Sequence, residues 1–460
     1  MPSTVLTRAM NKTESLDSDK KFSYSAWIKR SDLLDGCIIE GYYSSTFHSQ
    51  LYFDSNTNLT LNCASGTAGS AFQIVTNRKF RDTSAWYHIF LLIDTGDATA
   101  SDRAKIYVNG VRETSFSSAT YPNQNSSHQF SRNGNTTYIG RRNGGGSGLY
   151  FNGSMSHINT TSGHPNPAGV TEFGETDATT GEWKIKTAPS VTYGNNGFFI
   201  LKDGNSLTDQ SGESNDFTLN QGTLTKTEDN PSNNFPTFNI SLPIPNTSYI
   251  ENGALMAETF ASGNYLAGMS SLGMPRDSGI YYCEIMLIAE SATGESCIGV
   301  CSEEAFTQQD AGTVAIVGNN YNWGIRNNNG LEYYNGGQGT SKHGNFSAGD
   351  IMGVYFDSTN DRLTYSKNGG WWNGTSSWSG TSPDLVNYFV GTASGNYKTF
   401  FFNCGDSGNT VSAKWAANFG NGYFGQNAID SAGTNASGNG IFEFDTPTGA
   451  RALSTKGLNL

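Results

Sequence analysis

The chain has 460 residues, and its 28 Lys and Arg against 40 Asp and Glu give a net charge of −12. Its densest cationic spots are pairs (Lys20-Lys21, Lys29-Arg30 and Arg141-Arg142), whereas binding to nucleic acid needs clustered cations that displace counterions from phosphates. These numbers argue against a nucleic-acid partner and against an anionic membrane surface, and the length suggests roughly two to four domains.

The composition favours β-structure connected by turns. Gly reaches 55 residues, charged residues make up only 15%, and aromatic residues reach 12%. Aromatic and β-branched strands joined by Gly and Asn turns give such a composition, whereas helical proteins are rich in Ala, Leu, Glu and Lys. The longest apolar run, residues 89–93, is far shorter than the roughly 20 residues that span a bilayer. The N-terminus lacks the apolar stretch of a signal peptide, so we expect synthesis in a cytoplasm without membrane insertion.

In chain order, the first strand signal is residues 22–28, where apolar residues alternate with small or polar ones. Asn109-Gly110 predicts a type I′ hairpin turn, because both residues tolerate a positive φ. Residues 197–201 form an apolar strand that we expect to close a first β-sandwich. Further strands are predicted at residues 38–39, 50–54, 59–61, 72–75, 86–94, 105–108 and 138–140.

The middle of the chain is more polar. It contains a loop at residues 161–167 and a polar stretch at 173–183 with Phe173 and Trp183 as aromatic anchors. The prolines Pro231 and Pro236 indicate a linker. Strand signals then resume at residues 280–287, 297–300, 314–317, 323–325, 351–357, 363–367 and 400–402.

The sequence therefore predicts an all-β protein of two β-sandwich (jelly-roll) domains, with no amphipathic helix longer than three turns. The predicted parts are an N-terminal docking segment at residues 1–20, a sandwich at 21–215, a linker at 216–245 and a second sandwich at 246–460. The six cysteines include no CxxC pair, which favours small buried side chains in a reducing compartment. Cys297 and Cys301 are expected to share one face of a strand.

Motifs of the first predicted sandwich resemble those of concanavalin A-like, laminin-G-type domains. They are Phe22-Ser-Tyr-Ser-Ala-Trp27, Trp86-Tyr-His-Ile89, Asp94-Thr95, Lys105-Ile-Tyr-Val-Asn-Gly110, Tyr138-Ile-Gly140 and Tyr150-Phe-Asn-Gly-Ser-Met-Ser156. The second sandwich resembles a SPRY (B30.2) domain. Its motifs are Gly279-Ile-Tyr-Tyr-Cys-Glu284, Ile298-Gly-Val300, Gly349-Asp-Ile-Met-Gly-Val354, Leu363-Thr-Tyr-Ser-Lys-Asn-Gly369, Asn418-Phe-Gly420 and Pro447-Thr-Gly-Ala-Arg-Ala-Leu453.

The order of these motifs resembles that of large structural proteins of marine bacteriophages. The resemblance implies a non-enzymatic protein of the virion, most simply a tail fibre, spike or other adsorption component that recognises a host-surface glycan or protein. One alternative is a protein that decorates or cements the capsid or tail. The implied partners are other virion proteins, the host-surface ligand and further copies of the chain in a homo-oligomer. Residues 1–20 are expected to dock on another virion protein, because this polar segment cannot fold alone.

A polysaccharide-degrading glycosidase is the alternative from a different class. Concanavalin-like β-glucanases carry Glu-x-Asp-x-Glu on one strand, which places two carboxylates on either side of the scissile bond. Neither Glu175-Thr-Asp177 nor Glu443-Phe-Asp445 continues into this motif. The chain also has no Gly-x-Ser-x-Gly, P-loop or His-Glu-x-x-His motif. No catalytic residue is predicted, and His88 is expected to be structural.

Two groups of residues are candidates for binding. Asp94, Asp97 and Asp102 lie in one loop and could give Ca²⁺ hard oxygen ligands, or they could simply cap a solvated turn. An aromatic platform with neighbouring amides is typical of carbohydrate sites, and exposed tryptophans in a polar loop are costly unless they pack or bind. The ligand-binding candidates are Trp371, Trp372, Asn373, Trp378, Tyr321 and Trp323, and the competing interpretation is packing over the end of the sandwich or a subunit interface.

Overall fold

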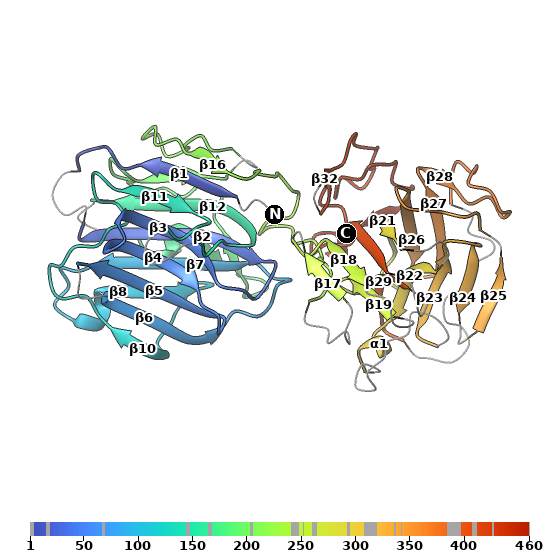
Figure 1. The fold of residues 1–460 in the computed structure, drawn as a ribbon, viewed down its shortest axis with the longest axis horizontal. Helices are drawn as coiled ribbons and strands as arrows, with labels where there is room; N and C mark the ends of the chain where they lie inside the picture. Colours follow the sequence, from blue (N-terminus) through green and yellow to red (C-terminus); the bar gives the residue numbers. More distant parts are fainter. Residues whose placement is uncertain are drawn as a thin grey trace. The chain divides into compact units, whose positions relative to one another are not determined.

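The computed structural model divides the chain into two compact units, Met1–Lys226 and Thr227–Leu460 (Figure 1). It describes residues 4–14, 19–66, 70–143, 148–163, 168–202, 206–240, 248–251, 253–259, 265–291, 295–307, 320–334, 337–341, 343–383, 397–406, 412–425 and 427–459. Regular structure in these residues is almost entirely β, as predicted. Helical structure there is limited to α1 (Glu304–Thr307) and the 3₁₀ turns η1 (Ala100–Asp102), η2 (Val170–Glu172) and η4 (Gly457–Asn459).

The first unit is built from two sheets that enclose one apolar core. The large sheet has the order β10 (Phe116–Thr120), β6 (Ser70–Lys79), β5 (Asn58–Ser65), β4 (Phe47–Phe53), β3 (Gly36–Ser44), β11 (Thr136–Ile139), β1 (Val5–Ala9), β16 (Thr218–Gln221). The small sheet has the order β15 (Phe198–Ile200), β12 (Gly153–Ser162), β2 (Lys21–Arg30), β7 (Tyr87–Asp94), β8 (Ala104–Val108), β9 (Val111–Arg112).

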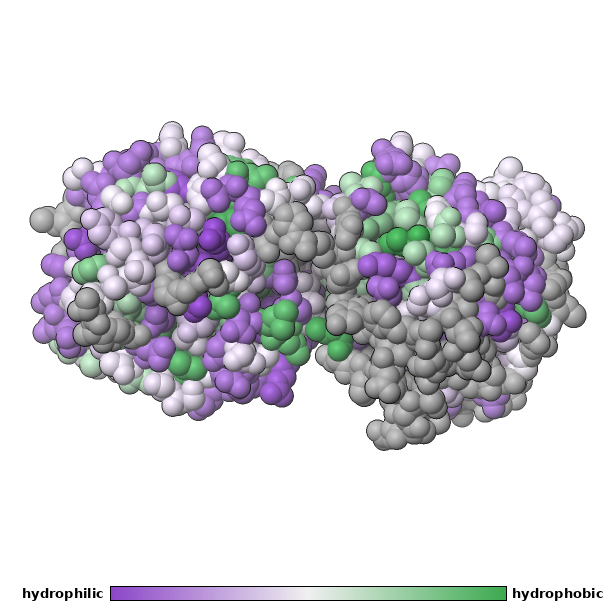
Figure 2. Space-filling view, in the orientation of Figure 1, coloured by the Kyte–Doolittle hydropathy of each residue, from purple (hydrophilic) through white to green (hydrophobic). Residues whose placement is uncertain are grey.

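The alternation of apolar residues predicted from the sequence produces this core. Phe22, Tyr24, Ala26 and Ile28 of β2 are all buried in it, two residues apart along the strand. The Asn109-Gly110 turn has φ values of 48° and 78°, the positive values that a type I′ hairpin requires. It joins β8 to β9 as expected. On the side of the first unit visible in Figure 2, apolar residues are scattered among polar ones.

The N-terminal segment, predicted to dock on another protein, is instead an integral part of the large sheet. Strand β1 pairs with β11 on one side and β16 on the other. Leu6 and Met10 are buried in the core, and the Glu14 carboxylate accepts a hydrogen bond from the backbone of Asn196. The segment is therefore not separate from the sandwich, because its polar appearance hides the apolar face that β1 presents to the core. Docking on another protein stays a prediction.

A short hairpin, β13 (Gly174–Thr176) and β14 (Trp183–Ile185), packs on the outer face of the small sheet. Its two aromatic residues are the predicted anchors. Phe173 is buried 5.8 Å from the Phe90 ring, and Trp183 stacks 5.8 Å from the His88 ring. Gly110 leaves room for the Trp183 indole, since a Cβ there would lie 2.4 Å from it.

The second unit also contains two sheets. One, the β21 sheet, has the order β17 (Ser248–Glu251), β18 (Met256–Thr259), β30 (Ala413–Asn418), β21 (Ile280–Glu290), β26 (Ile351–Asp357), β27 (Arg362–Lys367), β28 (Gly370–Trp371), and β33 (Ala450–Ala452) also pairs with β21. The other, the β29 sheet, has the order β19 (Tyr265–Met269), β29 (Thr399–Asp406), β22 (Ser296–Ser302), β23 (Asn322–Arg326), β24 (Leu331–Tyr334), β25 (Gly337–Ser341), with β20 (Met274–Pro275) beside β29. A small hairpin joins β31 (Tyr423–Phe424) to β32 (Asn427–Ala428).

A third layer covers part of the β21 sheet. Tyr282, Tyr355 and Trp371 form an apolar cluster with Phe442 and other residues of the C-terminal segment. The six cysteines are buried and free, and Cys297 and Cys301 belong to one cluster, as their spacing predicted. In the described part of the chain no helix is long and apolar enough to cross a membrane.

The boundary between the units differs from the predicted linker at residues 216–245. Strand β16 belongs to the large sheet of the first unit, and the chain passes to the second unit at Lys226 and Thr227. Phe235 and Phe238 are fully buried in clusters of the second unit. The polar residues of this segment predicted a linker, whereas its buried phenylalanines anchor it to the second unit. The predicted strand at 314–317 and most of the predicted loop at 161–167 lie outside the described residues.

Candidate functional site

Two of the tryptophans predicted to form a ligand platform are packed inside the second unit. Trp372 and Trp323 are each 1% exposed. The Trp372 ring lies 4.3 Å from the His343 ring, and the Trp323 ring lies 5.4 Å from the Tyr397 ring. A ring that is packed on its faces cannot stack on a ligand, so for these two residues packing was the better interpretation.

The other members of the loop also make internal contacts. Trp378 is half-buried 5.9 Å from the His343 ring, and Tyr321 is half-buried against the cluster that contains Cys301. Asn373 is exposed, but its side-chain oxygen accepts hydrogen bonds within its own turn. Of the six residues predicted to bind a ligand, Trp371 lines a cavity of the second unit whose other described lining residues are not among the six.

The three aspartates predicted to hold calcium do not converge on a common point. The Asp94 carboxylate lies 3.6 Å from Lys21 and accepts a backbone hydrogen bond in its turn, and Asp97 does the same for its own turn. Asp102 forms an ion pair of 2.8 Å with Arg112. Among the described residues, no group of three His, Cys, Asp or Glu could hold a metal ion. The alternative interpretation, a solvated turn whose carboxylates cap the backbone, is the one that fits.

Side chains on the outer face of the large sheet in the first unit form a continuous row that the sequence reasoning missed. Strand register places Tyr138 opposite Glu40, Glu40 opposite Gln50, Gln50 opposite Asn62, and Asn62 opposite Gln73. The neighbouring inward row, Ile139, Ile39, Leu51, Leu61 and Ile74, lies in the core. Adjacent strands are about 4.8 Å apart, so the polar row spans five strands with a regular spacing of functional groups.

Two tyrosines flank this row. Tyr42 lies on β3 opposite His48, and Tyr52 lies on β4 on the other side of Gln50. Each is two residues from the row, which is about 7 Å along a strand. Tyr42, Tyr52 and Tyr138 are all half-buried, as are Asn62 and Gln73, whereas Glu40 and Gln50 are buried. We call Tyr42, Tyr52, Tyr138, Glu40, Gln50, Asn62 and Gln73 the polar face.

Buried hydrogen bonds hold the polar face in place. Glu40 is fully buried, and its carboxylate accepts one hydrogen bond from Gln50 Nε2 at 2.8 Å and another from the Asn143 backbone at 2.6 Å. These bonds fix the side chain of Gln50 and the start of the loop after β11. The Arg142 guanidinium lies 5.9 Å from the centre of the Tyr52 ring, within the range of a cation–π contact.

The tyrosines of the face have restricted environments. The Tyr42 and Tyr138 rings meet edge to face at 6.1 Å. Burial is the main cause that raises the pKa of both Tyr52 and Tyr138, so their hydroxyls stay protonated at neutral pH. A fixed phenol and a planar amide each offer a donor and an acceptor, the two roles that a sugar hydroxyl also plays. The face can therefore read a pattern of hydroxyl groups with little reorganisation.

The same face lacks the groups that glycoside hydrolysis needs. Hydrolysis uses two carboxyl groups about 5–9 Å apart, one of which must give a proton. Glu40 is the one carboxylate in the row from Tyr138 to Gln73, and it is already bonded to Gln50 and Asn143. The signal for the face was present in the sequence, because polar residues take every second position of predicted strands.

Solved structures resemble parts of the chain at low identity. The SPRY domain of human HERC1 is 19% identical with a TM-score of 0.29, and the match covers 37% of this chain and 91% of that domain. A SAP-like pentraxin from Limulus polyphemus is 20% identical with a TM-score of 0.25, covering 34% and 69%. The CBM40 of a Ruminococcus gnavus IT-sialidase, bound to α2,3-sialyllactose, is 11% identical with a TM-score of 0.26, covering 36% and 94%.

Family models match each unit separately, and no curated protein matches the chain. Residues 7–171 match the concanavalin A-like lectin/glucanases superfamily. Residues 280–404 match the SPRY domain. The chain therefore carries a concanavalin A-like domain followed by a SPRY domain.

Proposed function

We propose that the protein is a non-enzymatic recognition protein that binds a glycan through the polar face of its first unit. The observation that carries this proposal is the row from Tyr138 to Gln73, which holds a half-buried phenol (Tyr138) and two half-buried amides (Asn62 and Gln73) on the outer face of one sheet, around the buried pair Glu40 and Gln50. Its members are held by the sheet and not by a loop, so few side chains must be ordered when a ligand binds. The match of residues 7–171 to a lectin and glucanase superfamily supports the same assignment.

Between the two chemistries in that superfamily, binding is favoured over hydrolysis. The polar row contains one carboxylate, Glu40, and it is fully buried beneath Gln50 and Asn143. A carboxylate in that position can neither attack a sugar carbon nor donate a proton to a leaving group that lies on the surface. The groups of the polar face therefore suit recognition of a glycan and not its hydrolysis.

We further propose that this recognition serves a bacteriophage particle as a tail fibre, spike or other adsorption component that meets a glycan or protein of the host surface. The support is the order of motifs along the chain, which resembles that of marine phage structural proteins. The arrangement of a lectin-like module and a SPRY module in one chain fits a role in attachment, because both kinds of module present rigid surfaces for binding.

The proposal is tested on an array of polysaccharides from the surfaces of marine bacteria. The unmodified protein is compared with the double variant Asn62→Ala/Gln73→Ala, which removes two amides of the polar face. The matched control is Asn133→Ala/Gln210→Ala, which removes the same residue types from exposed positions outside the face. We expect the first variant to lose affinity about tenfold or more, the loss of roughly 1.4 kcal/mol, and the control to bind normally. Equal binding by both variants would contradict glycan binding through the polar face.

A further inference from the structure

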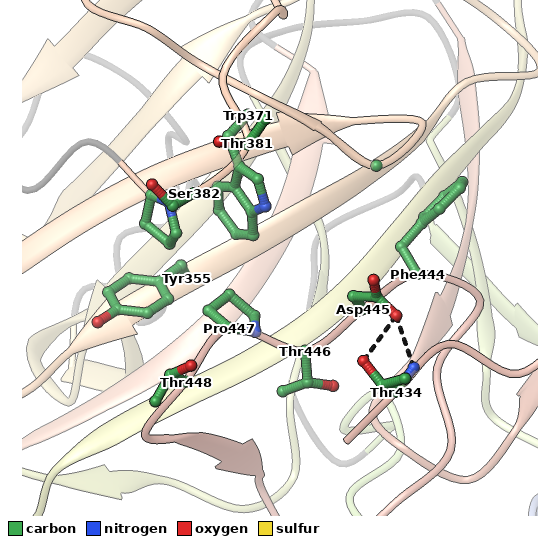
Figure 3. A pocket seen from close by; sticks show the side chains of 12 residues that line it. Tyr355, Trp371, Thr381, Ser382, Thr434, Phe444, Asp445, Thr446, Pro447 and Thr448 are labelled. Atoms are coloured by element: carbon green, nitrogen blue, oxygen red, sulfur yellow. Dashed lines mark hydrogen bonds between the residues drawn. The ribbon is translucent and has the colours of Figure 1, made fainter. Parts of the chain in front are cut away.

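The second unit contains a cavity of about 620 Å³, within the range of roughly 300–1,000 Å³ that is typical of small-molecule sites. It lies between strands β26 and β28 and the C-terminal segment that precedes β33 (Figure 3). The lining residues are Tyr355, Gly369, Trp371, Thr381, Ser382, Pro383, Thr434, Phe444, Asp445, Thr446, Pro447 and Thr448.

The aromatic wall of the cavity is rigid. Trp371 is 5% exposed and its ring lies 6.2 Å from those of both Tyr282 and Tyr355. Its backbone N–H and C=O are both bonded to Gly380. The ring is therefore held by its neighbours, and its indole N–H is the one polar group that the side chain can offer a ligand. Figure 3 shows the indole nitrogen on the side of the ring toward Asp445.

The opposite wall carries an acceptor and an unsatisfied hydroxyl. One carboxylate oxygen of Asp445 accepts hydrogen bonds from the Thr434 backbone and hydroxyl at 2.7 and 2.8 Å (Figure 3). These bonds lower the pKa of Asp445, so it is ionised at neutral pH. Thr446 is 8% exposed, and its buried Oγ1 has no hydrogen-bond partner among the described residues. A buried hydroxyl without a partner is costly. The Thr446 oxygen is closed off from the cavity, so Asp445 is the polar group that this wall offers a ligand.

Hydrogen bonds to strand β21 fix the C-terminal segment that bears Asp445 and Thr446. The fully buried Glu284 carboxylate accepts hydrogen bonds from the backbone N–H groups of Glu443 and Phe444 at 2.8 and 2.9 Å. Asn418 Nδ2 donates to the same carboxylate at 3.1 Å. The wall that contains Asp445 and Thr446 therefore starts from a fixed point in the β21 sheet.

The chemistry of the lining selects among ligands. Among the described residues, the lining contains five Ser and Thr, one Tyr and one Trp, with Asp445 as the one charged residue and no Lys, Arg or His. An anionic ligand would meet an uncompensated carboxylate, whereas a neutral polyol can donate to Asp445 and accept from the hydroxyls and the indole. We propose that this cavity is a second binding site, separate from the polar face, and that it takes a neutral sugar residue.

The test follows the tryptophan indole resonances of the full-length protein by ¹⁵N–¹H NMR. The chain has eight tryptophans, and the variant Trp371→Phe identifies the Trp371 signal. The probes are glucose, galactose, mannose and N-acetylglucosamine, added separately, with methylammonium as a cationic comparison. We expect at least one sugar to shift the Trp371 signal saturably and to leave the signals of the buried Trp323 and Trp415 in place.

The variant Asp445→Asn changes the chemistry with little change of shape. The amide oxygen can keep the two bonds from Thr434, and the free acceptor atom becomes a donor. We expect this variant to weaken sugar binding about tenfold or more, and Asp430→Asn, outside the lining, to leave it unchanged. The proposal fails if no sugar shifts the Trp371 signal, if Asp445→Asn binds normally, or if methylammonium binds and the sugars do not.

Discussion

His88 and Glu284 are buried titratable side chains whose surroundings favour the neutral form, and each makes stability depend on pH. The His88 ring lies between the Trp27 and Trp183 rings, with centroid distances of 5.1 and 5.8 Å. Its Nδ1 accepts a hydrogen bond from the Trp183 indole at 2.9 Å, and its Nε2 lies 2.8 Å from Ser25 Oγ. Because an indole can only donate, Nδ1 carries no proton, and the Nε2–H tautomer is assigned.

Burial lowers the pKa of His88 from 6.5 to about 3. Below pH 6.5 the imidazole is therefore protonated in the unfolded chain but neutral in the folded chain. The contribution of His88 to the free energy of unfolding is complete above pH 6.5 and is lost as the pH falls toward 3. At 1.36 kcal/mol per pH unit, this contribution falls by ~2 kcal/mol between pH 6.5 and 5. We expect the imidazole ¹⁵N shifts of His88 to stay those of a neutral ring at pH 5. In Trp183→Phe, which keeps a ring but removes the N–H donor, the pKa of His88 should rise. A His88 that titrates near 6.5 in the unmodified protein would contradict this assignment.

The contribution of Glu284 to stability changes with pH in the opposite direction. Burial raises its pKa from 4.5 to about 7, even though hydrogen bonds from Glu443, Phe444 and Asn418 favour the ionised form. The folded second unit therefore holds the proton more tightly than the unfolded chain does. The contribution is present below pH 4.5 and is lost as the pH rises to 7, by up to ~3 kcal/mol.

The variant Glu284→Gln cannot titrate and so isolates this effect. The difference in unfolding free energy between the unmodified protein and the variant should be larger at pH 5 than at pH 8, by up to ~3 kcal/mol. Urea unfolding of the second unit at the two pH values measures it. A difference that is the same at both values would mean that Glu284 is already ionised in the folded protein at pH 5.

At the scale of elements, strand β1 offers a matched pair of variants. Leu6 points into the core, whereas Thr7 lies on the outer face beside Thr218. Leu6→Ala should destabilise the first unit by about 2–4 kcal/mol because it leaves a cavity, and Thr7→Ala should cost less than about 1 kcal/mol. Thermal unfolding followed by circular dichroism compares them, with the transition of the second unit as an internal reference. Equal small effects would revive the idea that the N-terminal segment is free to dock elsewhere.

Strands with a clear apolar signal were predicted well, whereas the short strand β1 was not. Residues 351–357 coincide with β26, and residues 363–367 fall within β27, because a compact run of β-branched, aromatic and other apolar residues bounded by turn residues predicts a buried strand. Strand β1 has only five residues, and two of them are Thr7 and Arg8. Its place is set by β11 and β16, which are far away along the chain, and no local pattern contains that information.

At the scale of the whole molecule, the two-domain architecture was predictable from motif order, and the candidate sites were not. Three tryptophans in a polar loop predicted a ligand platform at Trp371–Trp378. Trp372 is instead buried against His343, and the sequence does not reveal that these two residues meet. The polar face depends on the register of five strands that span residues 36 to 139. A site made by register becomes visible only when the strands are paired.

The most direct test of the central claim is the binding of labelled, purified protein to intact host cells, with and without competing surface polysaccharide. It uses Tyr138→Ala, which removes a ring from the polar face, and Tyr107→Ala, which removes a half-buried tyrosine from the small sheet, after both variants are shown to be folded. The account predicts saturable binding that polysaccharide competes, that falls about tenfold or more in Tyr138→Ala, and that is unchanged in Tyr107→Ala. Folded protein that does not bind, or that binds equally well as Tyr138→Ala, would contradict glycan recognition by this face.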